Sequence, residues 1–168
     1  TDTSVCTECP AGTYSVNYAS VAADDCDVCP AGFFAETGQP CEKCPAGQYQ
    51  ANVGQPSCDL CPEGTYLADI GATSVDQCLP CPPGTATNIQ GSTICAPCAA
   101  GTYSPTERAS ECTLCPKGTA LATTGSIALT DCEDCPLGSV AINAGSAACA
   151  LCGPGSYSDI APGSGILA

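Results

Sequence analysis

The sequence predicts a small, disulfide-rich fold: an elongated tandem array of short β-hairpin and loop repeats, with little or no helix and no single hydrophobic core. Eighteen of the 168 residues are cysteine, a density typical of a disulfide scaffold. Large side chains are scarce, because the chain has no Trp or Met, two Phe and six Tyr. All the cysteines follow one repeating pattern. We therefore expect covalent cross-links to replace the packing of a large core.

The cysteines form nine Cys-x-x-Cys pairs, and the steps from one pair to the next are short and similar in length. No linker interrupts them, so residues 1–168 are interpreted as one continuous array of about nine repeats. The longest steps recur at every third pair, which gives a super-repeat of three units. This longer period fits either a superhelix with the longer loops on one side or the duplication of a three-unit block. The units begin at Cys6, Cys26, Cys41, Cys58, Cys78, Cys95, Cys112, Cys132 and Cys149.

Each pair is followed by a fixed set of turn and strand residues. Glycine lies three residues after every second cysteine, and proline directly follows that cysteine in seven of nine units. Pro-x-Gly predicts a tight turn, because Gly accepts a positive φ, and the Thr-Tyr residues after it favour a short strand. A second glycine then lets the chain turn back, which predicts one hairpin per repeat. The second glycines are Gly38, Gly54, Gly71, Gly91, Gly125 and Gly145.

One aromatic ring per repeat is expected to lie against the disulfide and to form the small core of that repeat. The ring stands five residues after the second cysteine in six of the nine units. Ala86, Ala120 and Val140 take this position in the other three, which we interpret as softer units or as units whose ring position is filled from outside. The predicted core rings are Tyr14, Phe34, Tyr49, Tyr66, Tyr103 and Tyr157.

The repeat resembles a known extracellular module. Cys-Pro-Ala-Gly-Thr-Tyr at 9–14, Cys-Pro-Ala-Gly-Gln-Tyr at 44–49 and Cys-Pro-Glu-Gly-Thr-Tyr at 61–66 resemble ephrin-receptor-like cysteine-rich repeats and the single-disulfide module of TNF-receptor ectodomains. The resemblance covers almost the whole chain and implies disulfide-laddered arrays outside the cell. Long arrays of this kind, low in Lys and rich in Ala and Gly, also resemble algal or protist surface proteins such as those of flagellar hairs, the mastigonemes. The second module of TNF receptors is missing, which argues against a cytokine receptor.

The resemblance also implies a disulfide pairing, in which the cysteine before proline pairs with the first cysteine of the next unit. Crosswise pairing of whole motifs, Cys6 with Cys26 and Cys9 with Cys29, is the alternative, and sequence alone does not prove either arrangement. Cys6 and Cys152 are left over at the ends and would pair with units beyond this segment or with another subunit. The implied pairs are Cys9–Cys26, Cys29–Cys41, Cys44–Cys58, Cys61–Cys78, Cys81–Cys95, Cys98–Cys112, Cys115–Cys132 and Cys135–Cys149.

Charge and composition exclude several classes of function. The chain has 3 basic and 17 acidic residues, a net charge of −14, and no histidine. This balance disfavours nucleic acids and anionic membranes as partners, and no apolar run is long enough to insert into a bilayer. Without histidine no Ser/His or Cys/His set exists, so we predict no enzyme. Thiols this dense indicate an oxidising, extracellular or cell-surface location. Since the chain begins at Thr1 without a leader, we interpret it as a segment of a longer secreted chain.

Metal binding is the main chemical alternative to disulfides. Nine Cys-x-x-Cys pairs would suit four-thiolate zinc sites, but their odd number and the hairpin signature favour disulfides. Two acidic clusters flank repeat corners and are interpreted as solvated surface, with Ca²⁺ binding as the weaker alternative, so no cofactor is predicted. No asparagine begins an N-glycosylation motif, whereas O-linked sugars remain plausible. The clusters comprise Asp24, Asp25 and Asp27, and Asp131, Glu133 and Asp134.

The function predicted from these features is structural: an extracellular, rod-like subunit of a filament, a flagellar hair of the mastigoneme kind or a cell-surface coat. Its partners would be copies of itself or other filament subunits. The alternative is a receptor or adhesion ectodomain that binds a protein ligand, which would need exposed aromatic or arginine anchors. The chain holds a single arginine, Arg108, which favours the structural role.

Overall fold

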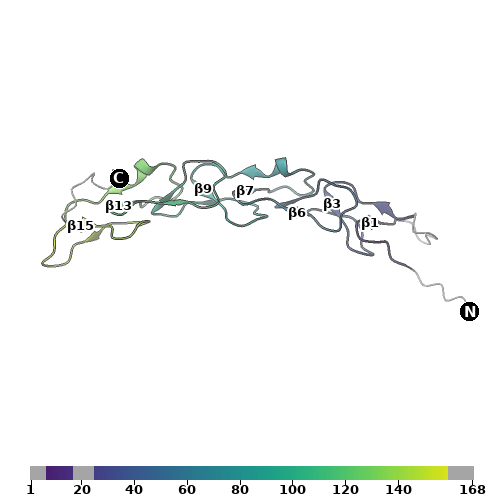
Figure 1. Cartoon of the computed structure of the whole chain (residues 1–168), viewed down its shortest axis with the longest axis horizontal. Helices are drawn as coiled ribbons and strands as arrows, with labels where there is room; N and C mark the ends of the chain where they lie inside the picture. The colour runs from purple at the N-terminus through teal and green to yellow at the C-terminus, as the bar shows by residue number, and fades with distance from the viewer. Residues whose placement is uncertain (1–6, 17–24, 159–168) are drawn as a thin grey trace, which may run out of the picture. The chain divides into compact units, whose positions relative to one another are not determined.

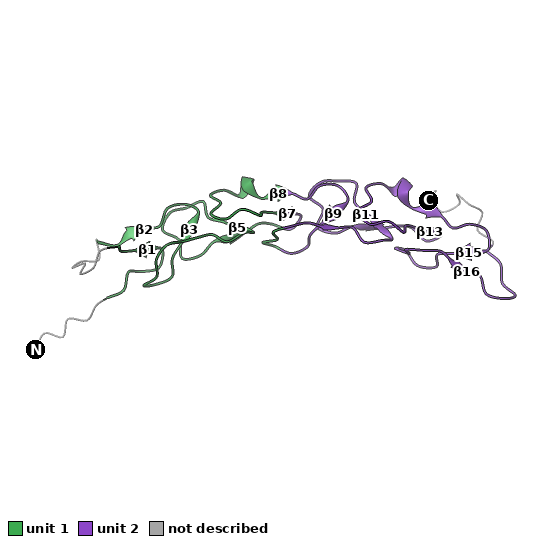
Figure 2. Cartoon of the chain, turned by 180° about the vertical axis from the view of Figure 1, so that it is seen from behind, with its two compact units in different colours: residues 1–62, 66–79, 90–93 green, residues 63–65, 80–89, 94–168 purple. Residues whose placement is uncertain are grey.

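The computed structural model describes residues 7–16 and 25–158, and the chain divides into two compact units. Unit 1 comprises residues 1–62, 66–79 and 90–93, and unit 2 comprises residues 63–65, 80–89 and 94–168 (Figure 2). Both consist of two-residue strands joined by turns and loops (Figure 1). The described residues contain no α-helix and no sheet of more than two strands. The predicted class, a small disulfide-rich array of hairpins, is confirmed.

Each hairpin pairs the strand after a turn glycine with the strand inside the next Cys-x-x-Cys motif. Antiparallel pairing places Thr13 opposite Val28 in the first hairpin and Phe33 opposite Lys43 in the second. In residues 13–80 the pairs are β1 (Thr13–Tyr14) with β2 (Asp27–Val28), β3 (Phe33–Phe34) with β4 (Glu42–Lys43), β5 (Gln48–Tyr49) with β6 (Asp59–Leu60), and β7 (Thr65–Tyr66) with β8 (Leu79–Pro80). In residues 85–151 they are β9 (Thr85–Ala86) with β10 (Ala96–Pro97), β11 (Thr102–Tyr103) with β12 (Thr113–Leu114), β13 (Thr119–Ala120) with β14 (Glu133–Asp134), and β15 (Ser139–Val140) with β16 (Ala150–Leu151).

The Pro-x-Gly turns have the geometry that the sequence predicts. At the first of them the amide of Thr13 donates to the carbonyl oxygen of Pro10 at 3.1 Å. Gly12 occupies the third position of this turn with φ +82°, a value that favours glycine. The Thr13 hydroxyl donates to the same carbonyl at 2.7 Å. Proline therefore supplies the acceptor that closes the turn, and the residues after it enter a strand.

Backbone hydrogen bonds join successive repeats in unit 1. The amide of Gly32 donates to the carbonyl of Gln50 in the next repeat at 2.8 Å. In return, the amide of Cys44 donates to the carbonyl of Gly32 at 2.9 Å. The amide of Gly54, a second glycine, donates back to the carbonyl of Cys29 at 2.8 Å. Each repeat is therefore held by its neighbours rather than by a core of its own, as in other repeat proteins.

Unit 2 repeats the same set of bonds with other residues. The amide of Gly84 donates to Ser104 at 2.8 Å, and the amide of Cys98 donates to Gly84 at 2.8 Å. The bond that a second glycine makes elsewhere is made here by Arg108, whose amide donates to Cys81 at 2.9 Å. The backbone pattern is therefore kept even where the glycine is replaced.

Arg108 is the one non-glycine residue with a positive φ, +62°, in the part of the chain that the structure describes. The sequence interpretation assigned no second glycine to this repeat and missed the position. Spacing was the signal that would have found it, because Gly54, Gly91 and Gly145 each lie four residues before the next first cysteine, as Arg108 does. A residue with a Cβ is strained in this conformation.

Replacing Arg108 by glycine should raise the free energy of unfolding by about 1 kcal/mol, because the strain of a left-handed side-chain-bearing residue is relieved. The change would appear as a higher denaturant midpoint of the oxidised protein. Lys117→Gly is the matched control, since Lys117 is also exposed and basic and is not among the residues with a positive φ. If Arg108→Gly lowered stability as much as the control does, the conclusion that Arg108 is strained would be wrong.

The described residues have no single hydrophobic core, as predicted, and bury two small clusters instead. In unit 1, Tyr49 packs against Leu67, Ala72 and the Cys61–Cys78 disulfide of the following repeat. The equivalent cluster in unit 2 lies one super-repeat further along the chain. It comprises Tyr103, Cys115, Leu121 and Cys132. A ring thus packs against the disulfide of the next repeat in both clusters.

The predicted ring positions account for only part of the buried side chains in the repeats. Tyr14, Phe34, Tyr49, Tyr66 and Tyr103 are half-buried. Tyr157 is 84% exposed, and the residues that follow Ser158 lie outside the described part of the chain. Its assignment to a repeat core therefore stays a prediction. The sequence interpretation also missed the position after the ring, which is buried in most repeats. The buried residues at that position are Ala35, Gln50, Leu67, Ser104, Leu121 and Ala141.

Two 3-10 turns, η2 (Val75–Gln77) and η3 (Leu129–Asp131), lie in two of the longest steps between cysteine pairs. The Gln77 side-chain oxygen accepts hydrogen bonds from the Thr73 amide at 2.7 Å and the Ser74 amide at 3.1 Å. The Asp131 carboxylate accepts the equivalent bonds from the amides of residues 127 and 128 at 3.1 and 3.0 Å. The longer units of the super-repeat therefore share a structure as well as a length.

Candidate functional site

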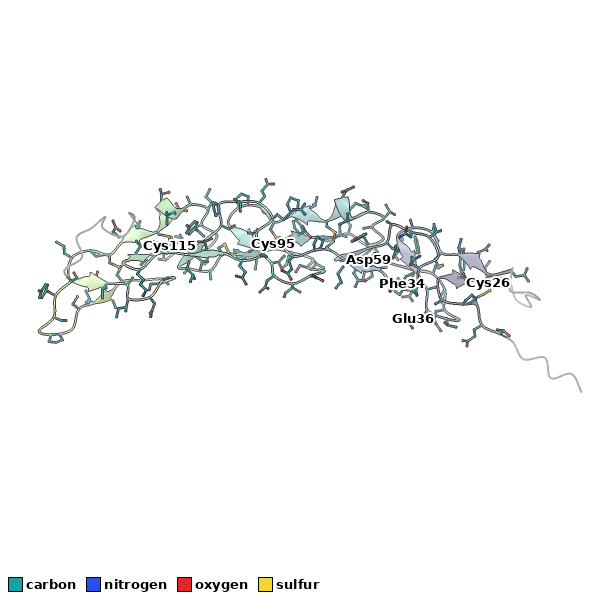
Figure 3. The ribbon with its side chains drawn as sticks, viewed as in Figure 1. Cys26, Phe34, Glu36, Asp59, Cys95 and Cys115 are labelled. Carbon is teal, nitrogen blue, oxygen red and sulfur yellow. A yellow bond between two sulfur atoms is a disulfide. The ribbon has the colours of Figure 1, made fainter. Side chains whose placement is uncertain are left out.

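The eight disulfides are the most extensive chemical feature of the molecule. Figure 3 draws them as yellow bonds and labels Cys26, Cys95 and Cys115, which belong to three of them. They close loops with sequence separations of 12, 14 or 17 residues. Their pairs are those that the family resemblance implies, and the described residues contain no crosswise pair. The pairs are Cys9–Cys26, Cys29–Cys41, Cys44–Cys58, Cys61–Cys78, Cys81–Cys95, Cys98–Cys112, Cys115–Cys132 and Cys135–Cys149.

Burial distinguishes the two cysteines of a bridge. The cysteine before proline is held by the backbone of the preceding turn, as in the 2.9 Å bond from the Cys61 amide to Gly47. The first cysteine of a motif reaches in from the far strand of the hairpin. One cysteine of each bridge in the middle of the array is therefore buried by the neighbouring repeats, whereas the partner cysteine is half-buried in four of these bridges, at Cys41, Cys58, Cys95 and Cys112. The cysteines that are no more than 1% exposed are Cys29, Cys44, Cys61, Cys81, Cys98 and Cys115.

Of the two end cysteines that were predicted to pair outside this segment, the structure describes only one. Cys6 lies outside the described residues. Cys152 is a free, half-buried thiol. Its amide donates to the carbonyl of Gly138 at 2.9 Å, the bond that paired second cysteines make in the other repeats. Cys152 therefore has the backbone position of a disulfide-forming cysteine without a partner among the described residues.

The acidic clusters are placed on the surface by the short strands and the 3-10 turn. Asp131 uses its carboxylate to cap η3, whereas Glu133 and Asp134 form the exposed strand β14. Asp25 and Asp27 are exposed, and Asp24 lies outside the described residues. Among the described residues no three His, Cys, Asp or Glu side chains lie close enough to hold a metal ion. No helix in this part of the chain is long and apolar enough to cross a membrane.

The family model described as tyrosine-protein kinase ephrin type A/B receptor-like matches residues 32–78 and 84–132, together more than half of the chain. The chain belongs to this family. Each ephrin-receptor-like match begins at a turn glycine and ends at the first cysteine after a 3-10 turn. Together with the eight disulfides, the ephrin-receptor-like repeats indicate an extracellular or secreted domain. No curated protein matches the chain.

Proposed function

We propose that this chain is a structural extracellular protein, a rod-like subunit of a filament, a mastigoneme-like flagellar hair or a cell-surface coat. The observation that supports this proposal most is the repetition of one linkage, a disulfide plus the same backbone bonds, at the described junctions from Gly12 to Gly118. At Gly138 the amide donates to the Ser158 hydroxyl instead. The repeated linkage serves mechanical continuity, since it is made of disulfides and backbone groups and is kept where the side chains differ, as at Arg108. A structural role needs no catalytic or cofactor site.

The disulfides create a covalent path that bypasses the loops. From Cys9 the path crosses the S–S bond to Cys26, follows the motif to Cys29, and crosses the next S–S bond to Cys41. The same alternation continues to Cys152 through the remaining bridges. Tension along the chain would pass through S–S bonds and three-residue motif steps, while loops of 12 to 17 residues stay unloaded. Extension would then require breaking covalent bonds rather than unfolding hairpins.

Cys152 is the point at which this covalent path would continue. We propose that its thiol pairs with the first cysteine of another repeat, in a neighbouring segment or another subunit, as each equivalent cysteine before it does. Alkylation of the native protein without reductant checks this proposal by mass spectrometry. Modification of Cys152 in native filaments would contradict it, and protection until a reductant is added is the expected result.

Electron microscopy of the native, non-reduced protein at physiological ionic strength tests the structural role. We expect regular filaments, and we expect reduced and alkylated material to lack them because the covalent path is cut. Single particles at every concentration would overturn the proposal and favour the receptor or adhesion ectodomain.

That second role is supported by exposed aliphatic side chains such as Ile94 and Ile142, which are 72% and 70% exposed, because such groups can serve as ligand contacts.

A further inference from the structure

The disulfides between Cys29 and Cys132 fall into two classes by burial. In Cys61–Cys78 and Cys115–Cys132 both cysteines are buried, because Cys78 and Cys132 are only 4% and 7% exposed. We call these two the buried disulfides. In the other four, the half-buried disulfides, the second cysteine of a motif is buried and the first cysteine of the next motif is half-buried. They are Cys29–Cys41, Cys44–Cys58, Cys81–Cys95 and Cys98–Cys112.

The buried disulfides occupy equivalent places in the super-repeat. Each ends at the cysteine directly after a 3-10 turn, Cys78 after η2 and Cys132 after η3. The amide of Cys78 donates to the carbonyl of Val75 at 3.0 Å, and the amide of Cys132 donates to the carbonyl of Leu129 at 3.0 Å. The same turn therefore fixes the first cysteine in both repeats.

A tyrosine ring and a leucine cover each buried disulfide. In unit 1, Tyr49 and Leu67 pack in the cluster that contains Cys61 and Cys78. Tyr49 also forms an isolated parallel β-bridge with Ala72, which lies in the loop that this disulfide closes. No such cluster surrounds a half-buried disulfide in the part of the chain that the structure describes. The equivalent residues of unit 2 are Tyr103, Leu121, Ser126, Cys115 and Cys132.

We propose that the half-buried disulfides exchange with small monothiols such as glutathione at their first cysteine, whereas the buried disulfides stay closed to them. Exchange requires that a thiolate reach one sulfur of the bond, so access decides which sulfur is attacked. In Cys44–Cys58 the buried Cys44 is shielded, which leaves Cys58 as the point of attack. The corresponding sites in the other half-buried disulfides are Cys41, Cys95 and Cys112.

The reaction at Cys58 is a simple exchange of sulfur partners. The glutathione thiolate attacks Sγ of Cys58, and the S–S bond to Cys44 breaks. The electron pair of that bond leaves on Sγ of Cys44, which takes a proton from water. The products are a mixed disulfide on Cys58 and a thiol at Cys44. The inference concerns the disulfides alone, and it is the same for a filament subunit and for an ectodomain.

The test exposes the oxidised protein to glutathione at neutral pH, stops the reaction with acid at early times and maps the products by mass spectrometry of peptic peptides. We expect glutathione on the first cysteines of the half-buried disulfides. The buried disulfides should open more slowly by about tenfold or more, because a local opening must precede attack. Equal rates for both classes, or adducts shared equally by the two cysteines of one disulfide, would overturn the proposal.

Removal of a covering ring tests the cause of the protection. Tyr49→Ala should make Cys61–Cys78 open about tenfold faster, at a rate close to that of Cys44–Cys58, because its cover is lost. Phe34→Ala is the matched control, since it removes a half-buried ring from the equivalent position of another repeat in unit 1, outside that cluster. It should leave the rate at Cys61–Cys78 unchanged.

An unchanged rate in Tyr49→Ala, or equal acceleration in both variants, would overturn the assignment of protection to the ring. Should Tyr49→Ala fail to fold, Tyr103→Ala makes the same change at Cys115–Cys132 in unit 2. The order in which the disulfides of the unmodified protein open tests the two classes without any variant.

Discussion

Reduction of all eight disulfides should unfold every described repeat. More than half of the buried hydrophobic residues in the described part of the chain are cysteines, and the two apolar clusters contain few other side chains. Closing a loop of about 15 residues stabilises a fold by about 3 kcal/mol, so eight bridges contribute on the order of 20 kcal/mol. Nothing else in the composition offsets a loss of that size. Proton NMR before and after addition of excess reductant measures it as a collapse of amide dispersion.

The control for this experiment is the oxidised protein, unfolded by heat or urea in the absence of reductant. It should retain its disulfides and recover its dispersed spectrum on return to native conditions. Dispersion that survives complete reduction, verified by mass after alkylation, would show that packing and hydrogen bonds suffice, and the account of the fold given above would be wrong.

Substitution of Gly47 by alanine should destabilise its junction by more than about 4 kcal/mol, because two backbones meet at this residue. A Cβ at Gly47 would overlap the carbonyl oxygen of Gly91, a rigid backbone atom. The overlap would separate the repeats and break the bonds from Gly47 to Leu67, 2.8 Å, and from Gly91 to Cys61, 2.8 Å. Left-handed strain adds about 1 kcal/mol to this loss.

Gly125→Ala is the matched control for this substitution. Gly125 also has a positive φ, +73° against +82° for Gly47, but the nearest atoms to a Cβ built there lie 3.9 Å away, an ordinary van der Waals contact. We expect the control to cost only about 1 kcal/mol. Amide hydrogen exchange at Gly91 is the readout, and Gly47→Ala should accelerate it by about a thousandfold. Equal costs for both alanines would mean that the close approach of repeats contributes nothing.

The family resemblance implied the disulfide pairing, and the positions of the cysteines in each hairpin explain that pairing. A cysteine before Pro-x-Gly sits at the base of a turn, and the first cysteine of the next motif returns on the opposite strand. Ser74 and Gln77 had the spacing of a capping box, yet the turn η2 was not predicted, because three residues are too few for a periodic signal. The position of Arg108 was likewise missed, since composition rules assign glycine, not arginine, to a left-handed position.

The sequence alone determines the hairpin unit, the repeat period, the turns and the absence of a large core. These features are local, because Pro, Gly and Cys determine the backbone conformation within a few residues of themselves. The surfaces that meet between repeats became known only from the folded chain. Turn glycines contact second glycines from two repeats further on, and the rings of Tyr49 and Tyr103 cover the next disulfide rather than their own. Those contacts join residues as far apart in sequence as Gly47 and Gly91. The residue pattern within one strand does not specify which distant residue packs against that strand.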